Sequence, residues 1–239
     1  MRLPVHGWVR TSLLDYPGHI CSCLFLAGCN FRCPYCHNPD LVLVPDNGPS
    51  PFSPEEIFGY FERYRGLLEG ICLSGGEPLL ARSILEFLRE VRSLGLKIKV
   101  DTNGSLPRML RRLLEEELVD YVAMDIKGPL EKIASIARSD MAEERLRAAL
   151  EESVRLLKGG TVAYEFRTTV VPGLLDEGDF EAIGEWLEGG TRFVLQQFRP
   201  GRTLDPAYSS LAPFPPDYLE HIARRMKKFV GACSIRGIG

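Results

Sequence analysis

Short apolar segments alternate with segments of helical periodicity from residue 20 to the end of the chain. Apolar runs of this length are typical of buried strands, and apolar side chains spaced three and four residues apart are typical of amphipathic helices. Strict alternation of the two predicts parallel strands joined by right-handed crossovers. The expected strands are 20–25, 70–74, 96–101, 119–126, 162–171 and 193–198.

Six strand–helix units restrict the architecture to a doubly wound sheet or a barrel. A complete eight-stranded barrel needs about 250 residues, and this chain has 239. We therefore expect an α/β fold, an incomplete (β/α)6 TIM-type barrel with its active site at the C-terminal ends of the strands. The chain is expected to form a single domain, 1–239, in which segment 1–19 packs across one end and residues 20–239 form the barrel.

The first helix of the barrel has a clear start signal. Ser53 is followed by Pro54 and, three residues after the serine, by Glu56. This order is typical of a capped helix N-terminus with a capping box. We expect this helix to run to about Leu68. Apolar stripes predict further helices around 80–91, 110–114, 146–157, 180–187 and 219–229.

Charge and hydropathy exclude several classes of protein. The chain has 29 basic and 32 acidic residues and a net charge of −3. Electrostatic binding of nucleic acid needs a basic excess, which this chain lacks. No segment approaches the roughly 18 apolar residues of a membrane helix, and the first ten residues lack the apolar run of a signal peptide. We expect a cytoplasmic protein that binds neither nucleic acid nor membrane.

Five of the seven cysteines lie within sixteen residues of one another. An odd number of cysteines in a chain of this size argues against a disulfide framework. Cys29, Cys33 and Cys36 stand in the sequence CNFRCPYC, and three thiolates on one short loop leave one position of a metal centre open. Iron–sulfur clusters are held by cysteine thiolates. The alternative is a closed zinc site, which needs a fourth ligand, here His37, Cys21 or Cys23.

Glycine-rich and charged segments follow the next expected strands. Each of them alone is typical of an ordinary turn or of a solvated charge. However, the C-terminal ends of parallel strands lie at one end of a barrel, where barrel enzymes keep their active sites. We therefore expect these segments to lie near the cysteine loop: GGEP at 75–78, DTNG at 101–104, DIK at 125–127, PG at 172–173 and RPG at 199–201.

The cysteine spacing and the GGEP turn together resemble the radical S-adenosylmethionine (radical SAM) superfamily. That family carries three cysteines spaced CxxxCxxC after the first strand and a GGE motif after the second. Further segments resemble the activases of glycyl radical enzymes, most of all the activating component of anaerobic ribonucleoside-triphosphate reductase. These segments are SLLDYPG (12–18), GCNFRCPYCHNP (28–39), DTNG (101–104), DIKG (125–128), RTTVVPG (167–173) and QQFRPG (196–201).

The resemblance implies a set of site residues. Cys29, Cys33 and Cys36 would ligate three irons of a 4Fe–4S cluster, whose fourth iron chelates SAM. The remaining positions would contact SAM, and the acidic ones among them hold a monovalent cation in some members. Tyr35 would lie near the adenine, Gly75, Gly76 and Glu77 would hold the methionine amino group, Asp101, Thr102 and Asp125 would form the acidic site, and Lys127 and Arg167 would contact polar groups of SAM.

The same resemblance implies a reaction and partners. A flavodoxin- or ferredoxin-type electron donor reduces the cluster, SAM is cleaved to a 5′-deoxyadenosyl radical, and this radical takes a hydrogen from a glycine of anaerobic ribonucleoside-triphosphate reductase. The alternatives are another glycyl radical enzyme, a peptide or a small molecule as substrate. A zinc-bound, non-catalytic binding module is a further alternative from a different class.

Three remaining features complete the expectations. Residues 37–71 contain no cysteine, so we expect one cluster and no additional cluster module. Some activases carry a late histidine near the nucleoside, whereas this chain has QQFR at 196–199, so the nucleoside contacts there stay open. Cys21, Cys23 and Cys72 lie in expected strands and should be buried, while Cys233 is expected to be exposed.

Overall fold

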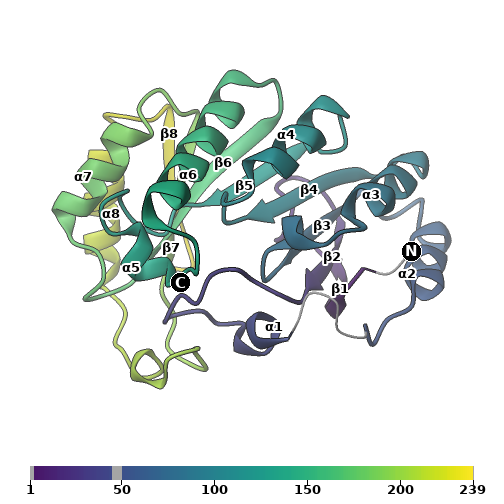
Figure 1. Ribbon diagram of the computed structural model, residues 1–239, viewed down its shortest axis with the longest axis horizontal. Coiled ribbons are helices and arrows are strands. Elements are labelled where there is room, and N and C mark those ends of the chain that lie inside the picture. The colour runs from purple at the N-terminus through teal and green to yellow at the C-terminus, as the bar shows by residue number, and fades with distance from the viewer. Residues whose placement is uncertain (1–2, 45–49, 239) are drawn as a thin grey trace.

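The computed structural model describes residues 3–44 and 50–238, and within them the strands form one eight-stranded sheet in the order β1 to β8 (Figure 1). β1 pairs antiparallel with β2, and every later neighbouring pair is parallel. The strands are β1 (Val5–Ser12), β2 (Cys21–Leu26), β3 (Gly70–Gly75), β4 (Lys97–Thr102), β5 (Tyr121–Asp125), β6 (Ala163–Val170), β7 (Arg192–Gln197) and β8 (Ala232–Arg236).

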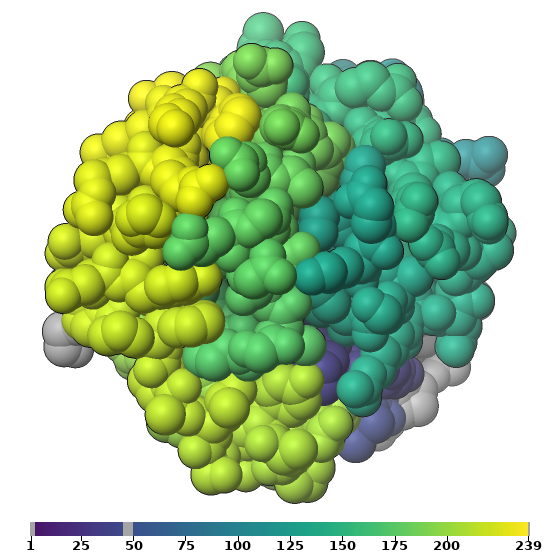
Figure 2. Space-filling view, turned by 90° about the vertical axis from the view of Figure 1, so that its left-hand side faces the viewer, coloured from purple at the N-terminus to yellow at the C-terminus, as the bar shows by residue number. Residues whose placement is uncertain are grey.

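Helices cover the outer side of the curved sheet, and the inner side stays open toward the loops that follow the strands (Figure 1). The helical elements are α1 (Pro39–Leu43), α2 (Pro54–Arg63), η1 (Pro78–Leu80), α3 (Ile84–Ser93), α4 (Pro107–Glu115), α5 (Ile133–Ala137), α6 (Glu143–Gly159), α7 (Glu177–Trp186), η2 (Pro206–Tyr208) and α8 (Pro216–Met226). Seen from the side of α7 and α8, the C-terminal half of the chain forms most of the surface (Figure 2).

The α/β fold class and the incomplete barrel are confirmed, and each of the six expected strands is present within a few residues of its predicted bounds. Two strands were missed. β1 lies in segment 1–19, which was expected to pack across one end of the barrel, but residues 5–12 extend the sheet at its edge. β8 follows the last helix and pairs with β7. Both are edge strands with half-exposed polar residues, so neither has the continuous apolar run of a central strand.

The start of α2 follows the sequence signal only in part. The Ser53 hydroxyl accepts the N–H of Glu56, as a capping serine does. The Glu56 carboxylate does not complete the capping box, because it pairs with Arg10 of β1 at 2.9 Å. The helix ends at Arg63 and not near Leu68. Gly66, a poor helix former, lies in the segment that leaves the helix.

The inner face of the sheet carries buried polar groups as well as thiols. Cys21, Cys23 and Cys72 are fully buried and pack around the Tyr16 ring, as expected for small apolar side chains. Cys233 is half-buried and not exposed, because β8 joins the sheet beside β7. Deeper along the same face, the buried Glu165 carboxylate accepts two hydrogen bonds from Arg236, at 2.6 and 2.8 Å. This pair ties the last strand to β6.

None of the helices in the described part of the chain is long and apolar enough to cross a membrane.

Candidate active site

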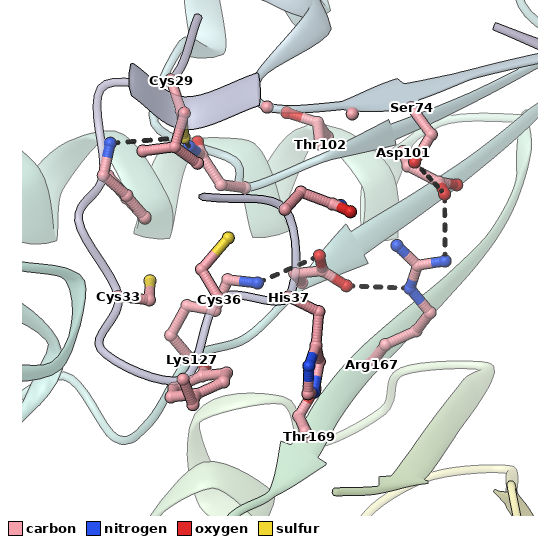
Figure 3. A pocket seen from close by; sticks show the side chains of 18 of the residues that line it. Cys29, Cys33, Cys36, His37, Ser74, Asp101, Thr102, Lys127, Arg167 and Thr169 are labelled. Carbon is pink, nitrogen blue, oxygen red and sulfur yellow. Dashed lines mark hydrogen bonds and ion pairs between the residues drawn. The ribbon is translucent and has the colours of Figure 1, made fainter. Parts of the chain in front are cut away.

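A cavity of about 310 Å³ lies where the C-terminal ends of the parallel strands meet the loop that follows β2 (Figure 3). Every residue that the sequence assigned to the site lines this cavity except Glu77. The lining residues of the expected set are Cys29, Cys33, Tyr35, Cys36, Gly75, Gly76, Asp101, Thr102, Asp125, Lys127 and Arg167. The fold therefore brings together expected site residues that are up to 138 positions apart in the sequence, from Cys29 to Arg167.

The three cysteines lie on one loop, residues 29–37, which we call the cysteine loop, and all three line the cavity (Figure 3). Burial raises the pKa of the Cys29 thiol to about 11 and that of Cys33 to about 12. Both thiols are therefore protonated at neutral pH until a metal displaces their protons. Among the described residues, no group of three His, Cys, Asp or Glu side chains is arranged to hold a single metal ion.

Two glycines at the end of β3 let the cysteine loop approach the sheet closely. Gly75 has φ of +116°, which L side chains rarely adopt, and a Cβ there would lie 2.4 Å from the backbone of Leu26. At Gly76 a Cβ would lie 2.0 Å from the carbonyl oxygen of Gly28 and 3.2 Å from the Cβ of Cys29. The two glycines thus let Cys29 lie close to the end of β3, and their own backbone lines the cavity.

Gly76→Ala is expected to destabilise the chain by about 2 kcal/mol or more, because the new methyl group meets backbone and must displace it. Urea unfolding of the purified protein measures this. Gly59→Ala is the matched control: Gly59 lies inside α2 with open space around it, so alanine there should stabilise the helix by up to about 1 kcal/mol. Equal free energies of unfolding for the two variants would contradict this account of the turn.

Charged side chains of alternating sign connect β4, β5 and β6 across the cavity floor. Asp101 contacts Lys99, accepts a hydrogen bond from Ser74 at 3.0 Å and lies 3.3 Å from Arg167. Arg167 also donates to Asp125 at 2.8 Å. Lys127 donates to Asp125 at 3.1 Å (Figure 3). Each carboxylate therefore contacts two cations of the chain itself, so the groups expected to attract a monovalent cation are already neutralised.

This network holds its members in their charged forms. Burial alone would raise the pKa of Asp125, but Arg167 and Lys127 lower it to about 2. Burial likewise works against the charge on Lys127 and Arg167, yet the neighbouring carboxylates raise both pKa values above the usual range. The cavity consequently presents fixed positive and negative charges side by side.

The lowered pKa of Asp125 predicts acid sensitivity. A carboxylate with a lower pKa in the folded chain stabilises it above the unfolded pKa, here 3.8, and this stabilisation is lost as the pH falls toward 2. The free energy of unfolding should drop by about 2 kcal/mol more between pH 4 and pH 2 in the wild type than in Asp125→Asn. Urea unfolding at a series of pH values measures both. Parallel pH profiles for the two proteins would count against the assigned ion pairs.

Glu77 is the one expected site residue that does not line the cavity, and its expected contact with an amino group there stays a prediction. It is buried behind the wall, where it accepts hydrogen bonds from the N–H of Asn103 at 2.6 Å, from Leu79 N–H at 3.0 Å and from the Thr102 hydroxyl at 2.9 Å. Burial raises the pKa of Glu77 to about 7, although these hydrogen bonds act in the opposite direction. Glu77 therefore stabilises the DTNG turn (residues 101–104) through hydrogen bonds from the side away from the cavity.

Several cavity residues were missed by sequence reasoning. Asp15 reaches the cavity from the turn after β1, where the Ser12 hydroxyl accepts the N–H of Leu14 and of Asp15. His37, which the sequence offered only as a possible zinc ligand, also lines it, and its ring stacks on Phe198 at 5.5 Å. Asp15 belongs to the SLLDYPG segment, but without β1 its position was not predictable. The other lining residues outside the expected set include Ser74, Asn103, Thr169 and Gln196.

Comparison with known proteins identifies the family. The sequence pattern of the radical SAM superfamily matches residues 24–187, which include the cysteine loop and the charged cavity floor. The chain belongs to the radical SAM superfamily. Membership implies a 4Fe–4S cluster and SAM as cofactors and a radical SAM enzyme as the class of protein. It thereby favours the iron–sulfur interpretation of the three cysteines over the zinc site.

Two relatives of this radical SAM protein extend over most of its length. A protein of Methanocaldococcus jannaschii that bears the name of a glycyl-radical enzyme activating enzyme is 32% identical over 239 residues, 100% of this chain and 98% of that protein. The pyruvate formate-lyase 1-activating enzyme of Escherichia coli K12 is 28% identical over 183 residues, 73% of this chain and 70% of the enzyme.

Solved structures of low sequence identity share the fold. QueE from Escherichia coli superimposes with a TM-score of 0.55 at 16% identity and covers 99% of this chain and 94% of its own. SuiB from Streptococcus suis, bound to S-adenosylmethionine, has a TM-score of 0.64 at 11% identity and covers 87% of this chain and 48% of its own.

The cavity of this radical SAM protein fits the cofactors of its family. Three thiols on one loop provide the donor set that iron–sulfur clusters use. Next to them, Gly75 and Gly76 line the cavity at a place where any side chain would collide with the chain. Beyond the glycines, the fixed cations and carboxylates match a ligand that carries both an ammonium and a carboxylate group.

Proposed function

We propose that this protein activates anaerobic ribonucleoside-triphosphate reductase by taking a hydrogen atom from one of its glycines. The observation that carries the proposal is the cavity that joins the three-cysteine loop to the charged ends of β4, β5 and β6, in a chain of this superfamily. The relatives named for glycyl radical enzymes support the activase class. The resemblance of the motifs supports the reductase as the partner.

We propose that Cys29, Cys33 and Cys36 ligate the cluster and that a flavodoxin- or ferredoxin-type protein supplies its electron. When bound, the cluster and SAM would together supply the reductive cleavage chemistry that removes a hydrogen atom from the substrate. The chain's own thiols give up their protons to bind iron, which their raised pKa values make dependent on pH.

The remaining cavity residues orient SAM in this proposal. Lys127 and Arg167 stay charged and face its carboxylate and hydroxyl groups. Asp101 and Asp125 face its ammonium group, together with the backbone of Gly75 and Gly76. Tyr35, which is buried in the cavity wall, packs against the adenine. Preorganised charges of this kind cost no reorganisation when the reaction begins.

A protein substrate is supported by the cavity's surroundings. A free small molecule at an open radical site is exposed to water and side reactions, which enzymes prevent by closing the site. A glycine loop from a large partner closes the cavity and supplies the hydrogen atom in the same step.

The test uses protein with its cluster reconstituted under anaerobic conditions, given SAM and a reductant. Adding the anaerobic reductase of the same organism should accelerate SAM cleavage and leave a stable radical on the reductase. The radical should give a doublet in its electron paramagnetic resonance spectrum. This doublet should collapse when the glycine of the reductase is deuterated at Cα. Pyruvate formate-lyase is tested in parallel. If the radical formed only on that enzyme, the reductase would be the wrong partner. Consumption of a small molecule in proportion to SAM, with no radical on any protein, would refute the activase proposal.

A further inference from the structure

A segment that follows β7 crosses the cysteine loop on the side away from the sheet. We call this segment, residues 202–205, the strap. The N–H of Leu204 donates to the carbonyl oxygen of Cys36 at 3.0 Å, and the N–H of Asp205 donates to that of Pro34 at 2.9 Å. Two consecutive backbone groups of the strap thus bind the part of the loop that carries the third cysteine.

The cysteine loop also rests on the end of α5. The N–H of Arg32 donates to the carbonyl oxygen of Ala137 at 2.7 Å. In Figure 2 a small purple area of the N-terminal segment is visible between the yellow-green segment after β7 and the teal segment in mid-chain, in agreement with these contacts. The loop is therefore enclosed between two elements that are distant in sequence.

Two ion pairs fasten the strap at its ends. Arg202 donates to Asp40 of α1 through two hydrogen bonds, at 2.5 and 2.6 Å, and Arg138 lies 3.6 Å from Asp205. Both side chains of the Arg202–Asp40 pair are about 70% exposed, at 71% and 69%. Exposed pairs contribute little to stability. The backbone hydrogen bonds to Pro34 and Cys36 are therefore the stronger part of the connection.

We propose that Leu204 and Asp205 are positioning residues that hold Cys36 in place through the backbone N–H groups of the strap, and so determine how long the cluster stays bound. This inference rests on the proposed function in one respect, the assignment of Cys36 as a ligand. Cys29 is positioned separately by Gly76 and the end of β3. At the other end of the loop the carbonyl oxygen of Cys36 accepts the N–H of Leu204 from the strap, and the ring of the next residue, His37, stacks on Phe198.

The test compares Leu204→Pro, which removes the N–H that binds Cys36, with Leu204→Ala, which keeps it. Ser210→Pro is a second control, because Ser210 is exposed and its N–H makes no hydrogen bond to another described residue. Each reconstituted protein is mixed anaerobically with an iron chelator, and cluster loss is followed by visible absorbance. Loss should be about tenfold faster in Leu204→Pro, which corresponds to about 1.4 kcal/mol, and within about twofold of wild type in both controls.

Two further measurements separate this role from general destabilisation. The thermal midpoint of the iron-free chain should differ little between Leu204→Pro and Ser210→Pro, while the electron paramagnetic resonance line shape of the reduced cluster should change only in the former. In wild type, the amides of Leu204 and Asp205 should exchange with deuterium at least tenfold more slowly than that of Arg202. This hydrogen-exchange measurement uses only the wild type, so it does not depend on whether a variant folds.

The outcomes are distinguishable. If wild type takes up no iron, the proposed function fails and this inference falls with it. If wild type binds the cluster but Leu204→Pro loses it no faster than Leu204→Ala, only the strap inference is overturned. Rapid exchange of the Leu204 and Asp205 amides in the loaded protein would overturn it as well.

Discussion

Cys29→Ala, Cys33→Ala and Cys36→Ala should each abolish stable cluster binding and SAM cleavage. All three thiols line one cavity, and they lie on one loop that is fixed on both sides. A thiolate lost from a three-thiolate site has no substitute in the fold, because the other buried cysteines lie away from the cavity around Tyr16. Iron and sulfide analysis after reconstitution, together with assays of SAM cleavage, measures the loss.

Cys72→Ala is the matched control for these variants. Cys72 is fully buried in β3, beside Cys23 of the neighbouring strand. Removing its sulfur leaves a small cavity and is expected to cost about 1 kcal/mol of stability, with iron content unchanged. Loss of iron in Cys72→Ala together with its retention in Cys33→Ala would show that the ligands are assigned to the wrong cysteines.

The barrel was predictable because two sequence signals indicate each of its central strands. Each is an apolar run, and each is followed by glycine or charge where the chain leaves the sheet. The edge strands lack both signals. β1 reads VHGWVRTS, and its pairing depends on β2, from which it is separated by a turn. Their existence is decided by the open edges of the curved sheet, which a local sequence pattern does not encode.

The site was predictable to the extent that its residues follow strands. Asp101 and Asp125 lie at the ends of β4 and β5, and Arg167 lies within β6 directly opposite Asp125, so the parallel sheet brings the three together. Of the cations in the network only Lys99 was missed, although it lies two residues before Asp101 and so on the same face of β4. Contacts of the cysteine loop with α5 and with the strap depend on loop conformations for which the sequence has no periodic signal.

The GGEP motif does not determine the direction in which the Glu77 side chain points. A glutamate after two glycines at a strand end can face the cavity or turn back into the protein. In this chain it turns back and accepts three hydrogen bonds in a buried position. Glu77 thus supports the DTNG turn from behind the cavity wall, and Asp101 and Asp125 are carboxylates at the ends of neighbouring strands that line the cavity.

Glu77→Ala and Asp101→Asn should therefore differ in what they lose. Glu77→Ala leaves three buried donors without an acceptor, which costs about 3 kcal/mol or more. One donor belongs to Asn103, whose side chain donates to Asn30 of the cysteine loop at 2.9 Å. The loss of Glu77 consequently reaches the cluster site, and iron content should fall together with SAM binding.

Asp101→Asn removes a charge from the cavity floor but leaves the turn and the cysteine loop intact, so iron content should stay near the wild-type value while SAM binding weakens at least tenfold. Iron analysis, SAM titration and urea unfolding on the same preparations distinguish the two variants. Glu77→Gln retains an acceptor oxygen at the same place and should recover most of the stability and iron that Glu77→Ala loses. If Glu77→Ala instead kept its iron and lost only SAM, the carboxylate would act from within the cavity, and its assignment as a support behind the wall would be wrong.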